Sequence, residues 1–404
     1  MKKNIELQTK GSTSAQISAT GVLIIPDGTK TIKQYEYRGN DNITMVVIPR
    51  SVTKISRAAF ENSTKLSRIK GGDGLKEIGI RAFKGTAIEE IVLPKLLQRL
   101  RACAFEECDN LKTVDFDNDN TLVEEGSFSN CRKLQTVMLP MNMNVIPDRL
   151  FFGCDNLECV ALSPNLKSVG NASFTNCCSL KQFYYYSFAK DHGLEFPNSA
   201  ISIGDEAFRG CKALTSVDIS DSVKSIGKGA FSDCTGLRSV NFGNSVTTVG
   251  YGAFENCSSL TRVFFPNGLT AIGVCEFTFC SSLTDVTIPE SVTTIAHSAF
   301  AGCKCLKKVT IPSSVSYIDH RVFSFCSSLS QVTIPNSVTS IGCYTFDGCS
   351  GLRQITFEGL TKMDVDHSSL TSCTGLITIN VPKEYLETYK EMLPKELHEK
   401  LVGF

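Results

Sequence analysis

The 404-residue sequence lacks tryptophan, net charge and long apolar runs. Because 41 Lys and Arg residues balance 41 Asp and Glu residues, we expect no general attraction to nucleic acid. No apolar stretch reaches the roughly 18 residues that a transmembrane helix needs, so we expect no membrane insertion through such a helix. The sequence also lacks a P-loop, a GxGxxG motif between a strand and a helix, and the GxSxG motif of serine hydrolases. We therefore expect no enzyme activity and no cofactor.

Residues 1–20 are expected to form a flexible N-terminus. They begin MKKNIELQTKGSTSAQ, in which two lysines are not followed by an apolar core, so this stretch is not a secretory signal. The protein is therefore expected to be intracellular or to have lost a leader, and the sequence leaves both alternatives open.

A 23-residue repeat dominates the rest of the chain. Three consecutive copies begin at Val286, Val309 and Val332 and read VTIPESVTTIAHSAFAGCKCL, VTIPSSVSYIDHRVFSFCSSL and VTIPNSVTSIGCYTFDGCSGL. Self-similarity at a period in the twenties indicates a solenoid. The repeat places an aromatic residue, or a leucine in the last copy, at about 15 positions: Tyr37, Phe60, Phe83, Phe105, Phe128, Phe151, Phe174, Phe208, Phe231, Phe254, Phe277, Phe300, Phe323, Phe346 and Leu370.

Each copy begins with the pattern of a strand. Val286 and Ile288 alternate with polar residues, which is typical of a half-buried strand. Pro289 has no N–H and ends the hydrogen-bond ladder, after which Val292 and Ile295 return to the interior. One copy buries too few apolar groups to offset the entropy of ordering its backbone. The copies must therefore stack and fold together.

Each later copy also carries a cysteine three residues after its aromatic. Cys303 and Leu306 lie three and six residues after Phe300, which predicts one face of a short helical turn. Stacked cysteines would have parallel Cβ atoms about 4.8 Å apart, whereas a disulfide needs about 3.8 Å. We therefore predict free, buried thiols. Twelve of the 18 cysteines share this position: Cys108, Cys131, Cys154, Cys177, Cys211, Cys234, Cys257, Cys280, Cys303, Cys326, Cys349 and Cys373.

The repeat is interrupted in three ways. The spacing from Phe83 to Phe105 is 22 residues, one fewer than a copy. The spacing from Phe174 to Phe208 is 34 residues, which places an 11-residue insertion within residues 181–193. The first copies also lack the cysteine, as expected of repeats that cap a stack, and hold Asn40, Ser63 and Thr86 instead.

Two segments around the insertion compete for one strand position. The first is residues 183–185 and the second residues 194–197. Only the second ends in proline and leads in phase into Ile203. With either choice, an aromatic-rich loop is expected to protrude from the sheet or to lie beside it.

The C-terminal residues 383–404 leave the repeat. Leu386, Tyr389 and Leu393 fall on one face of a helix, and a second short turn is expected around Leu397. We predict a helical cap over the last apolar edge of a single repeat domain that spans residues 21–382.

The pattern LxxVxIPxSVTxIGxxAFxxCxxL resembles the BspA-like, or Treponema pallidum-type, leucine-rich repeat. The resemblance covers roughly residues 20–382 and is most specific in LTDVTIPESVTTIAHSAFAGCKCL; the tail VPKEYLETYK is also similar to a common ending of these proteins. It implies an α/β-type, strand-rich leucine-rich repeat solenoid, a curved right-handed superhelix with a parallel sheet on its concave face. It also implies cell-surface attachment, binding of host extracellular-matrix proteins and coaggregation. The family has no shared catalytic residues.

The outward positions of the predicted sheet form the first candidate site. They are polar and rich in threonine, and such extended solenoid faces suit protein or glycan partners; alternatively, threonine merely fits a solvated strand. Aromatic and arginine side chains anchor interfaces, so the residues of the insertion and of the strand around Val263 stand out. The candidate partner-binding residues are Tyr184, Tyr186, Phe188, Arg262, Phe264, Lys308, Gln331 and Gln354.

A column of histidines is the second candidate. His297, His320 and His367 each lie three residues before the aromatic position, and Cys343 fills the same place in one intervening copy. Histidine and cysteine in register could suggest zinc, but four stacked copies extend over about 14 Å, whereas zinc ligands lie about 2.0–2.3 Å from one ion. We therefore predict no metal site and read the column as solvent-facing.

Taken together, these features predict a non-enzymatic, monomeric protein-interaction and adhesion module. The leading hypothesis is a bacterial cell-surface or secreted protein that binds host proteins or glycans through the sheet face. The alternative is an intracellular, cytoplasmic scaffold that binds a protein partner through the same face. A metal-dependent enzyme that uses the histidine column is a third hypothesis, which the geometry disfavours.

Overall fold

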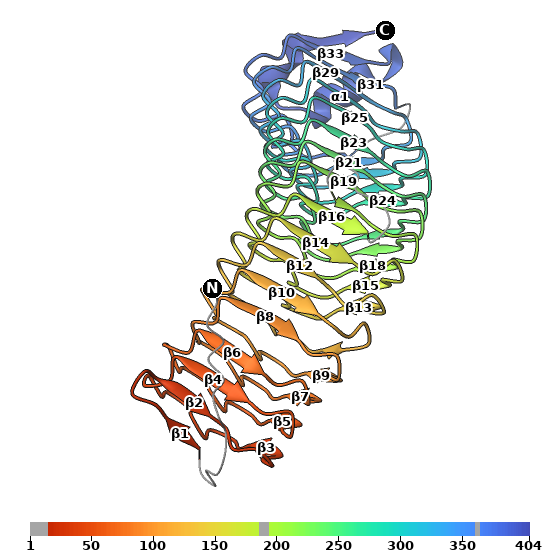
Figure 1. Ribbon diagram of the computed structural model, residues 1–404. Coiled ribbons are helices and arrows are strands. Elements are labelled where there is room, and N and C mark those ends of the chain that lie inside the picture. The colour runs from red at the N-terminus through yellow and green to blue at the C-terminus, as the bar shows by residue number, and fades with distance from the viewer. Residues whose placement is uncertain (1–14, 186–193, 360–363) are drawn as a thin grey trace, which may run out of the picture. The chain divides into compact units, whose positions relative to one another are not determined.

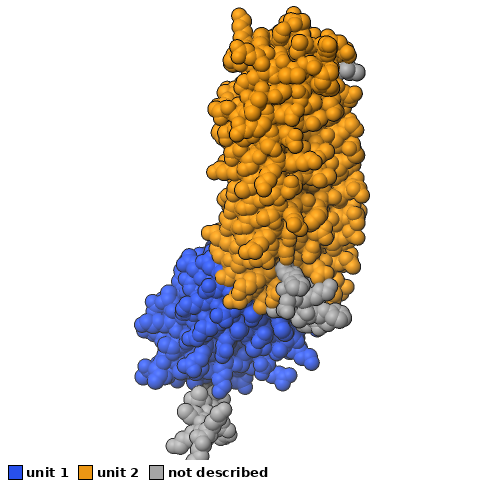
Figure 2. Space-filling view, turned by 90° about the horizontal axis from the view of Figure 1, so that it is seen from above, with its two compact units in different colours: residues 1–143, 153–157 blue, residues 144–152, 158–404 orange. Residues whose placement is uncertain are grey.

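The computed structural model describes residues 15–185, 194–359 and 364–404 (Figure 1). The chain divides into two compact units, residues 1–143 with 153–157 and residues 144–152 with 158–404 (Figure 2). Each unit is a solenoid of short parallel strands, so the predicted repeat solenoid is confirmed. A typical turn contributes two strands. The first, usually of three or four residues, forms what we call the long-strand face; the second, of two residues, forms the short-strand face.

In the first unit, the long-strand face begins with an antiparallel strand, β1 (Gln16–Ile17), which pairs with β2. The parallel strands that follow are β2 (Val22–Ile24), β4 (Met45–Ile48), β6 (Arg68–Gly71), β8 (Glu90–Leu93), β10 (Thr113–Phe116) and β12 (Thr136–Met138). The short-strand face consists of β3 (Thr31–Ile32), β5 (Lys54–Ile55), β7 (Glu77–Ile78), β9 (Arg99–Leu100) and β11 (Leu122–Val123).

In the second unit, the long-strand face holds β14 (Cys159–Leu162), β16 (Gln182–Tyr185), β17 (Leu194–Glu195), β19 (Ser216–Asp218), β21 (Ser239–Asn241), β23 (Arg262–Phe264), β25 (Asp285–Thr287), β27 (Lys308–Thr310), β29 (Gln331–Ile334), β31 (Gln354–Phe357) and β33 (Thr378–Val381). The short-strand face holds β13 (Val145–Ile146), β15 (Ser168–Val169), β18 (Ser202–Ile203), β20 (Ser225–Ile226), β22 (Thr248–Val249), β24 (Ala271–Ile272), β26 (Thr294–Ile295), β28 (Tyr317–Ile318), β30 (Ser340–Ile341) and β32 (Asp364–Val365).

The register of the strands follows the repeat. Val286 pairs with Val309 one copy further on, and Ile295 pairs with Ile318. The inward residues Val286, Ile295 and Ile318 are at most 4% exposed, while Asp285 is exposed. The alternation that predicts the long strands is therefore confirmed, and the return of isoleucine to the interior forms a second strand.

The aromatic position forms a column of stacked rings in each unit. Neighbouring ring centroids in this column lie 5.2–5.8 Å apart. The column runs without interruption through both irregular spacings: the Phe83 and Phe105 rings are 5.2 Å apart, and so are those of Phe174 and Phe208. The described phenylalanines of the column that the repeat places in the interior are fully buried.

The segment around each aromatic is not helical, which corrects the predicted helical turn. Cys303 N–H donates to the Phe300 carbonyl at 3.2 Å, and Leu306 N–H donates to the Cys303 carbonyl at 3.1 Å, so the chain makes successive tight turns. Ser298 and Gly302, two residues either side of Phe300, have φ of 57° and 73°. Left-handed residues at this spacing interrupt any helix. They are held because alternate N–H groups bond to the next copy, as Phe300 N–H does to the Val322 carbonyl at 3.0 Å.

The cysteine column lies behind the rings and is buried, as predicted. Each thiol donates to the carbonyl oxygen of the aromatic residue in the preceding copy; Cys257 Sγ, for example, lies 3.2 Å from the Phe231 oxygen. The twelve distances are all 3.1–3.3 Å. Ser63 makes the equivalent bond to the Tyr37 carbonyl at 2.6 Å in an early copy. Because the same bond recurs from copy to copy, this position supplies a small, buried hydrogen-bond donor in each of these copies.

Thiol titration checks this arrangement. All 18 cysteines are free, and Cys305 is exposed. Burial blocks reagents and raises the pKa of column thiols such as Cys234 and Cys108, in both cases to about 12. Near pH 8 we expect Cys305 to react first with Ellman's reagent and the twelve column thiols to react only after unfolding. Cys305→Ser should remove the fastest phase. Detection of fewer than 18 thiols in denaturant without reductant would show instead that disulfides exist.

The insertion adds a strand to one face only. Both competing segments form strands: β16 pairs with β14, and β17 pairs with β19. On the short-strand face, β15 pairs directly with β18. The two segments do not exclude each other, because the insertion supplies a second long strand with no short strand between. Phe183 and Phe196 fill the added interior, with ring centroids 6.0 Å apart and each at most 5% exposed.

The C-terminus contains the predicted helix and ends in a strand. Helix α1 (Leu386–Met392) lies between two 3-10 segments, Lys383–Tyr385 and Lys395–Lys400. Tyr389 is buried, and its ring lies 5.2 Å from that of Phe357. The final strand β34 (Leu401–Gly403) pairs in parallel with β33, so it covers the last strand edge. No helix in the described part of the chain is long and apolar enough to cross a membrane.

Candidate functional site

The long-strand face presents the predicted outward residues to solvent. In β10, β12, β25 and β27 the outward side chains are exposed while the residue between them is buried. In β19, β21 and β31 some outward side chains are half-buried. The outward orientation deduced from the repeat is therefore confirmed, and its polar, threonine-rich composition gives a surface able to donate and accept hydrogen bonds.

Arg262 and Phe264 are the most conspicuous residues on this face. They lie on one side of β23, and Phe264 is 57% exposed although it is a large apolar side chain. Arg262 is level with Ser239, and Phe264 is level with Asn241. An exposed aromatic beside an arginine, with small polar neighbours, has the composition of an interface anchor.

The other predicted binding residues are spread along the second unit. Lys308 is exposed in β27, level with Asp285 of β25. Gln331 and Gln354 are level with each other in β29 and β31. The backbone of Tyr184 lies in β16, paired with Ala161. Tyr186 and Phe188 lie outside the described residues. Arg262 and Phe264 thus share one strand, and Lys308, Gln331 and Gln354 hold the same position in three consecutive copies.

The histidine column has a structural explanation. His320 Nδ1 accepts a hydrogen bond from the backbone N–H of Cys343 at 2.8 Å, and the His320 N–H donates to Asp319 Oδ1 at 2.6 Å. His297 is half-buried and His367 is exposed. Among the described residues, no group of three or more His, Cys, Asp or Glu side chains could hold a metal ion.

Earlier copies use acidic and amide side chains at the same position. Asp148 accepts from the Asn171 N–H at 2.7 Å, Asn171 from the Asp205 N–H at 2.8 Å, and Asp205 from the Lys228 N–H at 2.7 Å. The position therefore serves to satisfy backbone N–H groups of the next copy. His320 is one more member of this series.

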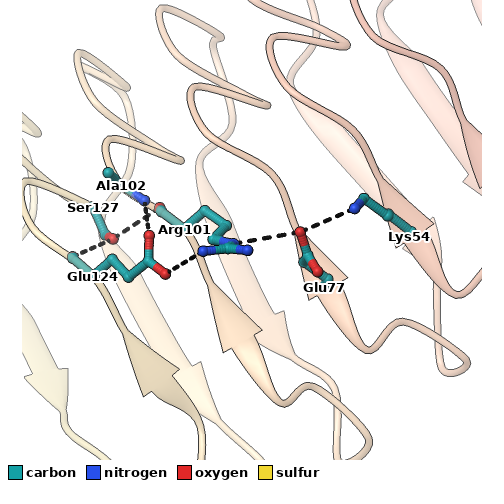
Figure 3. A network of polar contacts seen from close by, with 6 residues as sticks. All are labelled: Lys54, Glu77, Arg101, Ala102, Glu124 and Ser127. Carbon is teal, nitrogen blue, oxygen red and sulfur yellow. Dashed lines mark hydrogen bonds and ion pairs between the residues drawn. The ribbon is translucent and has the colours of Figure 1, made fainter.

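A row of ion pairs crosses the short-strand face of the first unit (Figure 3). Glu77 lies 3.2 Å from Lys54 and 3.4 Å from Arg101, whose other side meets Glu124 at 2.9 Å. Partial burial opposes ionisation of Glu77, but the hydrogen bonds and charges of Lys54 and Arg101 prevail and lower its pKa. Because the charges neutralise one another across neighbouring copies, this row is better suited to joining copies than to attracting a ligand.

Glu276 is a buried acid that the sequence reading missed. It occupies the position before Phe277 where most copies hold Ala or another small residue, and it is 0% exposed. Its Oε2 accepts the Gly273 N–H at 2.6 Å, whereas Oε1 has no hydrogen-bond partner within the described part of the chain. Burial raises its pKa to about 8. Comparison of this position across copies would have drawn attention to Glu276 and to Glu36, which precedes Tyr37 in the first copy and is exposed.

Phe279 and Phe325 are two further exceptions. Both are more than half exposed and have φ of 60° and 59°, at a position where most other copies hold Gly or Asn. A Cβ atom on Gly302 would lie 2.5 Å from a ring carbon of Phe279, and Gly348 has the same relation to Phe325. Each ring thus lies over a glycine of the next copy.

Known protein families and solved structures share the repeat and the solenoid fold described above. The family model described as BspA type leucine rich repeat region matches residues 16–97, 76–193, 184–306 and 271–393. A leucine-rich repeat protein from Bacteroides ovatus is 30% identical, with a TM-score of 0.73 over 85% of this chain and 91% of that chain.

Two more distant solved structures are also similar. The leucine-rich repeat protein of T. pallidum is 28% identical, with a TM-score of 0.37 over 48% of this chain and 77% of its own. A leucine rich cell surface protein from Faecalibacterium prausnitzii is 19% identical, with a TM-score of 0.43 over 85% of this chain and 93% of its own. No curated protein matches the chain.

Proposed function

Because the chain belongs to the BspA-type leucine-rich repeat family, whose fold is a scaffold for protein interactions, we propose that it is a bacterial surface or secreted adhesion module. It binds host proteins or glycans through the long-strand face of its second unit. The observation that carries this proposal is the exposed pair Arg262 and Phe264 within a polar strand surface. Family members are often surface proteins, which supports the proposed location.

Mutation of the anchor pair tests the binding role. The protein is first screened against immobilised extracellular-matrix proteins and a glycan array. For a ligand that is found, Arg262→Ala combined with Phe264→Ala should weaken binding at least about tenfold, because truncated aromatic and arginine anchors often cost 2 kcal/mol or more. The matched control is Thr248→Ala with Thr294→Ala, two exposed residues on the short-strand face of nearby copies. Equal affinities for the two double variants would contradict the proposed site.

The cellular location is tested separately. Intact native cells are treated with protease, and the chain is then detected with an antibody. Loss of the signal, with a cytoplasmic control protein intact, supports the surface proposal. Protection until lysis would contradict it.

The second candidate is an intracellular scaffold that binds a protein partner through the same face. The free thiols, including the exposed Cys305, favour it, because reducing compartments keep cysteines in this form. Protection from protease in intact cells is the result expected for this candidate.

A further inference from the structure

The hydrogen-bond ladder of the long-strand face is interrupted between β6 and β8. Strands β1 to β6 form one sheet, and β8 begins another, so the facing edges of β6 and β8 are not paired. The same two copies remain joined elsewhere: β7 pairs with β9, and Phe83 N–H donates to the Ala104 carbonyl at 2.9 Å. The opening is therefore confined to one face. We call it the β6–β8 slot (Figure 1).

Gly71 explains why the slot is hollow. It occupies the place that Ile48 fills one copy earlier and Leu93 fills one copy later, so a large inward side chain is missing. Gly71 has φ of 81°, and a Cβ atom there would lie 2.3 Å from the Ile48 carbonyl oxygen. No side chain fits this backbone without a shift, so the void is part of the local fold. The copy is also followed by the 22-residue spacing, which shortens the turn between Thr86 and Ile88.

A cavity of about 400 Å³ occupies the slot. Its floor is aliphatic and includes Ile55, Ile78 and Leu93. Ile69 and Ile91, the inward residues of β6 and β8, also line it and are only half-buried. The equivalent residues of β4 and β10 are at most 1% exposed. The ladder is interrupted at other places in the second unit, but the first unit combines an interruption, a missing side chain and an open cavity.

The mouth of the cavity is acidic. Asp73, Glu90, Asp115 and Asp117 line it and are exposed, and no Lys or Arg is among the lining residues. None of these four carboxylates has an ion-pair partner among the described residues. The strand β6 also presents Arg68 and Lys70 to solvent, so basic ligand groups are favoured beside the carboxylates of Glu90, Asp115 and Asp117 rather than beside β6.

We propose that the β6–β8 slot binds an extended segment of a partner protein by strand addition. The segment pairs its backbone with the open edges of β6 and β8, which are four residues long each. Strand geometry sends alternate side chains to opposite sides, so apolar residues enter the cavity while Lys or Arg residues meet the carboxylates. This site lies in the first unit and does not depend on the anchor pair in β23.

The direct test uses a labelled peptide of sequence Lys-Ile-Lys-Ile-Lys-Ile with blocked ends. Fluorescence anisotropy should show binding to the full chain that weakens as salt increases. Asp115→Asn with Asp117→Asn should reduce affinity about tenfold. The matched control, Asp218→Asn with Asp285→Asn, removes two exposed strand carboxylates of the second unit and should leave affinity unchanged.

Backbone pairing is tested by chemistry on the peptide. Methylation of alternate peptide nitrogens keeps charge and side chains but removes the N–H donors, so it should abolish binding. Hydrogen exchange should show that the unmodified peptide protects amides of β6 and β8. Insertion of one serine between Thr86 and Ala87 restores the 23-residue spacing and should reduce binding by closing the slot.

Three outcomes would overturn the proposal. They are equal binding of the methylated peptide, equal affinity of the two Asp variants, and protection of amides away from β6 and β8. Binding that occurs only after removal of residues 1–14, which include Lys2, Lys3, Ile5 and Leu7, would assign the slot to the chain's own N-terminal segment and would also overturn it.

Discussion

Glu276→Gln is expected to remove a pH dependence of stability worth on the order of 4–5 kcal/mol. The buried carboxyl has a pKa of about 8, against an ordinary value of 4.5, because burial disfavours its charge. Between these values the unfolded chain releases the proton while the folded chain keeps it. The free energy of unfolding of the natural protein should therefore fall as pH rises from about 4.5 to about 8, by roughly 1.4 kcal/mol per pH unit, and the contribution of Glu276 then levels off.

Two substitutions separate charge from shape at this position. Gln keeps the volume and the acceptor for the Gly273 N–H, whereas Ala restores the residue that Ala253 and Ala299 supply in neighbouring copies. Neither can ionise, so neither variant should show the fall in stability that Glu276 causes between pH 5 and pH 7. Ala also removes the unpartnered oxygen, at the cost of a small void.

The measurement is guanidinium unfolding at several pH values between 5 and 7, below the range in which thiols of the unfolded chain lose protons that the buried thiols keep. Glu290→Ala is the control, because Glu290 is an exposed carboxylate in the same unit and should leave the slope as it is. A natural protein whose stability does not change over this range would contradict the prediction. So would a slope that persists in both Glu276 variants.

Phe300→Ala is expected to cost about 3–5 kcal/mol, while Phe279→Asn should stabilise the protein by up to about 1 kcal/mol. Phe300 is fully buried, with its ring 5.6 Å from Phe277 and 5.8 Å from Phe323. Truncation removes both ring contacts and leaves a cavity inside the column. Phe279 is 54% exposed and has φ of 60°, a conformation that Asn adopts at lower cost.

The two phenylalanines thus form a matched pair of one residue type in neighbouring copies. Guanidinium unfolding of both variants at a pH well below 4.5, where Glu276 is protonated in the folded and the unfolded state, isolates the packing effect. Phe300→Leu should fall between Phe300→Ala and the natural protein, because it keeps part of the buried volume. Similar losses for Phe300→Ala and Phe279→Asn would mean that exposure and backbone conformation do not govern stability at these positions.

The repeat predicts the interior well because it repeats apolar residues, and apolar residues are what a stack must bury. Val286 and Ile288 could be placed inward from alternation alone, and the rings and thiols from their spacing. The short-strand face could not be predicted in this way. A strand such as β26, Thr294–Ile295, has only two residues and therefore shows no period.

The tight turn around each aromatic could also not be predicted from the residues of that segment alone. The left-handed position two residues before the aromatic holds residues as different as Arg81, Glu206 and Tyr344, so no residue preference identifies it. Hydrogen bonds to the next copy impose the conformation. The β6–β8 slot is similar: the 22-residue spacing is visible, but the opening depends on how Gly71 meets the preceding copy.

The stacking of rings within each unit has a consequence for the insertions and deletions that the chain can accept. Phe83 stacks on Phe105 although a residue is missing between them, and Phe174 stacks on Phe208 although 11 are added, with ring planes only 10° and 5° apart. Each turn contributes one ring to the column. The long-strand face, in contrast, gains a strand at the insertion and loses the pairing between β6 and β8. Insertions and deletions that begin after the tight turn around the aromatic and end before the next long strand can therefore change the outer surface without disturbing the column of stacked rings. Changes in chain length at this place can therefore produce new binding surfaces while the buried column that stabilises the fold is kept.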